Sequence, residues 1–144
     1  GSQTAFFTGT TENTVTIPGT AGNVITVGAY NARTRTYATF SGRGPLDSSR
    51  IKPDLVAPGV DVISCSPGGG YTARTGTSMA CPFVTGAAAL WMQWGMVEGN
   101  DPYLYGEKMR AFLIGNARPL SETGVYPNNR EGWGRLCAKG DLVE

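Results

Sequence analysis

A serine followed by a run of small apolar residues is the part of the sequence best suited to chemistry. The stretch 76–90 reads GTSMACPFVTGAAAL, with Ser78 near its start and Pro82 soon after. This pattern predicts a helix that begins near Ser78, runs to about Trp94 and stops at Gly95. Because the run is so apolar and so small, we expect the helix to be buried on all sides. A hydroxyl at the positive end of a buried helix suits a nucleophile; the alternative is that Ser78 only caps the helix.

The lack of histidine limits what this serine can do by itself. A serine nucleophile passes its proton to a general base, most often histidine, and none of the 144 residues is histidine. No pair of carboxylates has a spacing that suggests acid–base catalysis. Three interpretations stay open: the chain is a fragment, it works with another polypeptide, or it does something else.

Composition favours one modest globular domain of the α/β class. The sequence has 21 glycines, 9 prolines and a formal net charge of +1. Tight turns are therefore expected, and no cluster of Lys and Arg indicates a nucleic acid or an anionic membrane as partner. No apolar run reaches the roughly 18 residues of a membrane span.

The three cysteines, Cys65, Cys81 and Cys137, are too few and too scattered for a disulfide framework. We expect three small buried residues, with a single Cys65–Cys81 bridge as the alternative. A zinc site is not expected, because the chain has neither a C-x-x-C pair nor a histidine. No metal site is predicted.

Hydrophobic patterning predicts several short strands and up to three helices. Strands are expected at 14–17 (an edge strand), 23–30, 37–40, 54–57 and 60–65, with a flexible glycine loop at 67–70. A second helix should start at Asp101-Pro102 and end near Gly115-Asn116. We expect its buried face to contain Leu104, Met109, Phe112 and Leu113, and a short terminal helix to span 137–143. Trp91 and Trp94 are interpreted as packing residues.

Several motifs resemble the subtilisin-like serine proteases, the subtilases, in the order that the family has them. The nucleophile motif of the family is similar to Gly76-Thr77-Ser78-Met79-Ala80 with Pro82. The other matching segments are 23–29 (NVITVGA), 40–45 (FSGRGP), 52–59 (KPDLVAPG) and 132–136 (GWGRL). The resemblance runs from about residue 15 to the end, and the sequence is similar to those of clostridial members of the family. It implies that residues 1–144 are the C-terminal portion of a subtilase catalytic domain.

For the fold, the resemblance implies part of a parallel sheet flanked by helices, with the nucleophile helix at its centre. For the site, it implies that Ser78 is the catalytic nucleophile and that its backbone N–H is one oxyanion donor. Thr77 would support that oxyanion hole, and Met79 would lie on the leaving-group side of the substrate. The family's Asp, His and oxyanion Asn precede anything present here, in the Asp–His–Ser order.

Three residues of the matching segments need separate interpretation. Cys81 stands where the family usually has Ser or Ala, and Phe83 stands where many members have a structural histidine. Asp54 is interpreted as a hydrogen-bonding residue of the turn into its strand, or as lying near a weak cation site. The alternative, that Asp54 is the acid of the triad, conflicts with the order of the motifs.

The function implied is a serine endopeptidase that cleaves polypeptides through an acyl-enzyme in the full-length parent, with this chain inactive alone. Its partners would be a polypeptide substrate and the remainder of the catalytic domain, and an exposed sheet edge could also promote self-association. The alternatives are a pseudoprotease that binds peptides without hydrolysis and a processed two-chain enzyme. No cofactor is expected; calcium is common in the family, but no acidic cluster here indicates a strong site. The resemblance implies a secreted or cell-surface parent, with a spore-associated or intracellular one as the alternative.

Overall fold

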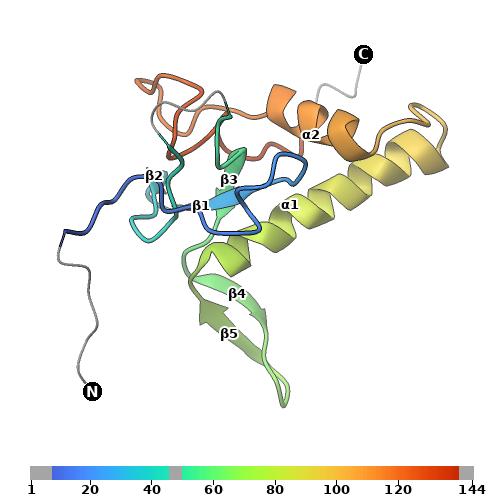
Figure 1. Cartoon of the computed structure of the whole chain (residues 1–144). Coiled ribbons are helices and arrows are strands. Elements are labelled where there is room, and N and C mark those ends of the chain that lie inside the picture. Colours follow the sequence, from blue (N-terminus) through green and yellow to red (C-terminus); the bar gives the residue numbers. More distant parts are fainter. Residues whose placement is uncertain (1–7, 46–49, 140–144) are drawn as a thin grey trace.

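The computed structural model describes residues 8–45 and 50–139, and these form a mixed α/β unit. A three-stranded sheet lies beside the first half of a long helix, and a second helix packs near the far half of that helix (Figure 1). A separate two-stranded hairpin extends away from the rest of the molecule, below the start of the long helix (Figure 1). The predicted α/β class is confirmed.

The three-stranded sheet has the order β2-β1-β3 and contains one parallel pair. β1 (Val27–Asn31) pairs in parallel with β3 (Leu55–Pro58), and it pairs antiparallel with β2 (Thr36–Tyr37). The outer side of β3 is covered by the C-terminal segment, since Leu136 N–H donates to the Val56 carbonyl at 2.8 Å and Val56 N–H donates to Gly134 at 2.9 Å. The strands expected at 23–30 and 54–57 are present with shifted ends, whereas only Tyr37 of the strand expected at 37–40 lies in a strand.

The edge strand expected at 14–17 is absent, so that prediction is wrong. The N–H groups of Thr14 and Val15 both donate to the carbonyl of Arg43, at 2.7 and 3.1 Å. Two donors that share one acceptor do not form a ladder. The alternating residues therefore lie in an irregular segment rather than in a strand.

The hairpin consists of β4 (Val62–Cys65) and β5 (Tyr71–Arg74). β4 lies within the strand expected at 60–65, whereas β5 was not predicted. Its turn contains Gly68, Gly69 and Gly70, all with positive φ, a conformation that glycine adopts without the steric cost of a Cβ. The glycine loop is thus the turn of a hairpin.

The long helix, α1, spans Thr77–Met92 and continues as a π-helical segment, η1, over Gln93–Val97. Gly95 is buried inside that segment, so its predicted role as the stop is wrong. A Cβ at Gly95 would lie 2.9 Å from the Asp101 carbonyl oxygen and 3.0 Å from Leu104 Cβ. The glycine therefore allows the 101–104 turn to approach the helix closely.

The prediction that α1 is buried on all sides is also wrong. Its buried residues form one stripe, consisting of Ala80, Val84, Ala87 and Trp91. On other faces Phe83 is 42% exposed and Leu90 is 67% exposed. In the described part of the chain, the sheet and α2 cover one side of the helix and leave an apolar side in solvent.

The second helix, α2, spans Gly106–Gly115. It begins later than expected, because Asp101 starts a separate turn in which its carbonyl accepts from Leu104 N–H at 3.1 Å. Its end at Gly115 is as predicted. Residues 137–139 are not helical, and the rest of the helix expected at 137–143 lies outside the described residues.

The main core lies between α1, α2 and the parallel strands. Trp91 is 3% exposed and meets Phe112 edge-on with ring centroids 4.8 Å apart, while Trp94 approaches Trp91 at 6.0 Å. Both tryptophans are therefore packing residues, as predicted. Of the expected α2 face, Phe112 is half-buried, and three residues are buried: Leu104, Met109 and Leu113.

Candidate functional site

Ser78 is the second residue of α1 and is exposed. The residue that caps the helix is Gly76, and no side chain makes a capping hydrogen bond there. The interpretation of Ser78 as the cap is therefore wrong, because the helix begins one residue before it. Its hydroxyl makes no hydrogen bond with any described residue, and Ser78 lies at the positive end of the helix.

The start of α1 is fixed against the carboxyl ends of the two parallel strands. Gly59, just after β3, donates to the Tyr30 carbonyl of β1 at 3.0 Å, and Gly76 N–H donates to the Gly59 carbonyl at 2.8 Å. A Cβ at Gly59 would lie 2.6 Å from Ala29 Cβ, so a side chain does not fit there. This edge of a parallel sheet is where open α/β folds commonly place their sites.

The backbone beside the hydroxyl offers a hydrogen-bond donor. Residues of the first helical turn have no intrahelical acceptor for their N–H groups. Met79 N–H turns back to the Gly76 carbonyl at 3.0 Å, whereas Ser78 N–H has no acceptor among the described residues. An unpaired N–H next to a hydroxyl is the arrangement that an oxyanion hole requires.

A cavity of about 360 Å³ lies beside Thr77. It is lined by uncharged residues from the segment 14–19, from the start of β1 and from the 40–42 turn: Thr14, Val15, Thr16, Gly19, Thr26, Val27, Gly28, Phe40, Gly42, Pro53 and Thr77. Thr77 is thus placed at a cavity next to Ser78. Met79 is half-buried on α1 but does not line this cavity.

An ionic contact joins the chain near Thr14 to the chain near Gly42, two residues that line this cavity. The Arg43 guanidinium contacts a Glu12 carboxylate oxygen at 2.8 Å, and Asn129 also donates to Glu12. The hydrogen bond from Arg43, followed by that from Asn129, lowers the pKa of Glu12 below its ordinary value. The irregular N-terminal segment is therefore tied to the 43–44 turn and to the C-terminal loop.

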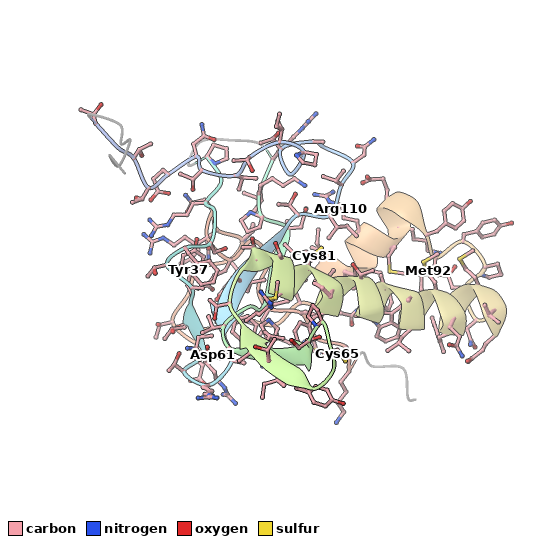
Figure 2. The ribbon with its side chains drawn as sticks, turned by 90° about the horizontal axis from the view of Figure 1, so that it is seen from below. Tyr37, Asp61, Cys65, Cys81, Met92 and Arg110 are labelled. Atoms are coloured by element: carbon pink, nitrogen blue, oxygen red, sulfur yellow. The ribbon has the colours of Figure 1, made fainter. Side chains whose placement is uncertain are left out.

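Asp54 forms the centre of a buried ionic cluster. It is fully buried, and its Oδ2 accepts from Lys52 Nζ and from Thr26 N–H, both at 2.7 Å. Its Oδ1 accepts from Arg110 Nε at 2.8 Å and from Arg110 Nη2 at 2.6 Å. With both oxygens in use, the geometry agrees with a structural hydrogen-bonding role and joins β3 to α2 through Arg110, which Figure 2 labels.

The Lys52 ammonium, which also donates to the Val24 carbonyl at 2.7 Å, supplies positive charge beside Asp54. In the described ranges 8–45 and 50–139, no group of three or more acidic, Cys or His side chains is arranged to hold a metal ion. Sequence reasoning did not find Arg110, because 56 residues separate it from Asp54 and no local pattern links the two.

All three cysteines are free thiols, so the alternative Cys65–Cys81 bridge is not formed. Cys65 and Cys81 are exposed and Cys137 is half-buried, which contradicts the expectation of three buried residues. Figure 2 shows Cys65 on the hairpin and Cys81 on α1. Their exposure follows from the two uncovered surfaces, the hairpin and the outer side of α1.

Among the described residues, no helix is both long enough and apolar enough to cross a membrane. The described residues provide a hydroxyl, an unpaired N–H and an uncharged cavity lined by the neighbouring Thr77, and the sequence has no histidine to act as the usual general base. These parts match one half of the machinery of a serine hydrolase.

Comparison with known proteins identifies the family. The model of the Subtilase family matches residues 2–134. The structure of the CspB protease of Clostridium perfringens superposes with a TM-score of 0.89 at 42% identity, covering 94% of this chain and 29% of that one. The minor extracellular protease Vpr of Bacillus subtilis is 37% identical in an alignment of length 106 that covers 67% of this chain and 12% of Vpr. An intracellular serine protease of Paenibacillus polymyxa is 38% identical in an alignment of length 113 that covers 75% of this chain and 32% of that protein.

The chain thus spans less than a third of the length of CspB and Vpr. The relatives include a protease named as extracellular and one named as intracellular. The family model covers most of the sequence, and the structural match extends over nearly all of it. The chain belongs to the subtilase family of serine proteases.

Proposed function

We propose that Ser78 is the nucleophile of a serine endopeptidase and that this chain is inactive without a general base from another polypeptide segment. The observation that carries the proposal is the exposed, unpaired Ser78 hydroxyl in Gly76-Thr77-Ser78, within the segment that the Subtilase model matches. In the complete protease, meaning this chain together with the segment that supplies the base, the substrate is a polypeptide.

The chemistry assigns a separate task to each group. Ser78 Oγ attacks the scissile carbonyl carbon while the base takes its proton, and the Ser78 N–H donates to the oxyanion that forms. Collapse breaks the C–N bond, and the base returns the proton to the leaving amine. Water then hydrolyses the acyl-enzyme. Thr77 lines the cavity beside the reacting carbonyl, and Met79 borders the leaving-group side.

The outer side of α1 suits the segment that brings the base. Phe83 and Leu90 leave apolar area in solvent on the same helix that carries Ser78, and a stable protein seldom leaves such a surface uncovered. The solved relative CspB is more than three times as long as the part that this chain matches. We therefore assign this side of α1 to the remainder of the catalytic domain rather than to a second copy of the chain.

Secretion or surface display remains our proposal for the parent, with an intracellular parent as the alternative.

Replacing Ser78 by alanine in the complete protease tests the proposal. The variant should lose kcat/KM for a peptide substrate by at least about three orders of magnitude. Ser64→Ala, which removes an exposed hydroxyl from the hairpin, should not change it. Retention of hydrolysis by Ser78→Ala would overturn the assignment, and peptide binding without hydrolysis by the unaltered protein would favour the pseudoprotease.

A further inference from the structure

One face of the β4–β5 hairpin has no charged side chain and is mostly apolar. In its register Ile63 is opposite Ala73, and Cys65 is opposite Tyr71. Residues two apart on a strand point to the same side, so these four side chains share one face. Ile63 and Tyr71, the two large ones, are diagonal neighbours about 7–8 Å apart.

This apolar face is the one that lies in solvent. Ile63 is 70% exposed and Tyr71 is 78% exposed, and Cys65 and Ala73 are exposed too. The half-buried residues of the hairpin, Val62 and Thr72, are on the opposite face. Antiparallel strands normally turn their apolar face inward and their polar face to water, so the pattern here is inverted. Such an inversion marks a binding surface.

The position of the hairpin relates this surface to the nucleophile. Only Thr75 and Gly76 separate β5 from α1, whose second residue is Ser78. The hairpin is also anchored at this end, because the Asp61 N–H donates to Thr75 Oγ1 at 3.0 Å. Figure 1 shows the hairpin extending from the start of α1 without other elements beside it.

We propose that this hairpin face is an exosite that binds an apolar side chain of the polypeptide substrate, outside the residues that flank the scissile bond. The inference rests on the proposed function of Ser78. The occupant is an extended substrate segment with a branched aliphatic or aromatic residue. Tyr71 and Ile63 would contact that residue, and the exposed backbone edge of the hairpin is available for strand-like pairing with the segment.

The size of the surface favours a substrate segment over a second copy of the chain. Four side chains of these sizes expose a few hundred Å², whereas a stable protein–protein interface buries about 800 Å² on each partner. A short extended peptide needs no more than this. The contact between such a peptide and the hairpin face would also be weak, which suits a substrate whose products must dissociate.

The distance from Ser78 sets which substrate residue is bound. A strand rises by about 3.3 Å per residue, so Tyr71 lies about 10 Å along β5 from Arg74. Adding the turn before Ser78, an extended substrate would reach Tyr71 with a residue about three to six positions from the scissile bond.

The test uses the complete protease with Ser78→Ala, so that peptides bind without being cleaved. Two fluorescent peptides share one cleavable core; one has a phenylalanine about five residues from the scissile bond, and the other has serine there. We expect the double variant Ile63→Ser/Tyr71→Ser to weaken binding of the phenylalanine peptide roughly fivefold to twentyfold, measured by fluorescence anisotropy. Its affinity for the serine peptide should not change. Ser64→Ala, on the opposite face, is the matched control and should change neither.

Equal loss for both peptides, or no loss for either, would overturn the exosite. Alkylation of Cys65 in the native complete protease, located by mass spectrometry, is the second measurement, because Cys65 shares the face. Protection of Cys65 in the absence of peptide would show that another part of the protein covers the face and would also overturn the proposal. If wild-type protein hydrolyses neither peptide, the proposed function fails, while the binding comparison still decides the exosite.

Discussion

Replacing Asp54 by leucine should destabilise the fold strongly, although Asp54 takes no part in the proposed chemistry. The carboxylate is fully buried, and Lys52 beside it is 5% exposed. The substitution would leave the Lys52 ammonium with no counter-charge and Thr26 N–H with no acceptor. Breaking a buried pair from one side costs about 3–5 kcal/mol. We expect a loss of that size in the free energy of unfolding, measured by urea denaturation with tryptophan fluorescence.

The surface pair of Lys108 and Asp101 is the matched control. The two pairs have similar lengths, 2.6 Å for Lys108–Asp101 and 2.7 Å for Lys52–Asp54, but Lys108 is 53% exposed. Water screens such a pair and solvates either partner when the other is removed. Lys108→Met should therefore leave the free energy of unfolding nearly unchanged.

The double variant Lys52→Met/Asp54→Leu separates burial from charge. It removes both partners, so that no charge of this pair remains unpaired in the core, and roughly half of the loss should be recovered. Arg110 is partly exposed and keeps Glu107 as a neighbour, with Nη1 to Oε2 at 3.6 Å. If Asp54→Leu unfolds at the same urea concentration as wild type, the cluster has no structural role. If the double variant is less stable than Asp54→Leu, the charge argument is wrong.

Two further predictions concern backbone packing and pH. Gly59→Ala should cost about 1–3 kcal/mol of stability and reduce the proposed activity, because the new Cβ would lie 2.6 Å from Ala29 Cβ and 2.9 Å from the Gly76 carbonyl oxygen. Gly86→Ala is the control, because a Cβ there meets open space. Equal stability of the two variants would refute the reasoning. The pKa of Tyr126 is raised above its ordinary 10.0, first by burial and then by its hydrogen bond to Glu131. The contribution of Tyr126 to stability is therefore complete below pH 10 and is lost as pH rises through the raised pKa. An ultraviolet titration should show one tyrosine that ionises late, and this signal should be missing in Tyr126→Phe. If the wild type and the variant titrate alike, the prediction is contradicted.

The sequence was sufficient to predict the family, the α/β class and the elements with strong local signals. The prolines at 53 and 58 bounded β3 closely, and the spacing of Met109 and Leu113 located the buried face of α2. Local propensity was less informative where tertiary contacts determine the structure of a segment. Gly95 is a packing glycine rather than a stop.

The errors at the site have physical causes of the same kind. Serine favours the cap position, but Gly76 takes it here with a φ of 156°, a backbone conformation that residues with a side chain rarely adopt, so the alternative of Ser78 as the cap is wrong. β5 was missed because Tyr71–Arg74 is short and polar on one side, and its pairing with β4 is specified by the glycine turn. The expectation that α1 is buried on all sides rested on its composition alone. Within the described residues, only one side of this helix is covered.

Labelling with a fluorophosphonate probe tests the central claim most directly. In the complete protease, mass spectrometry should find the probe on Ser78 at near-stoichiometric yield, because the base activates that hydroxyl. In the isolated chain, which has no histidine, Ser78 should remain unlabelled under the same conditions. Labelling of Ser78 at a similar rate in the isolated chain would contradict the requirement for a second segment, and labelling of another serine in an active complete protease would contradict the assignment of the nucleophile.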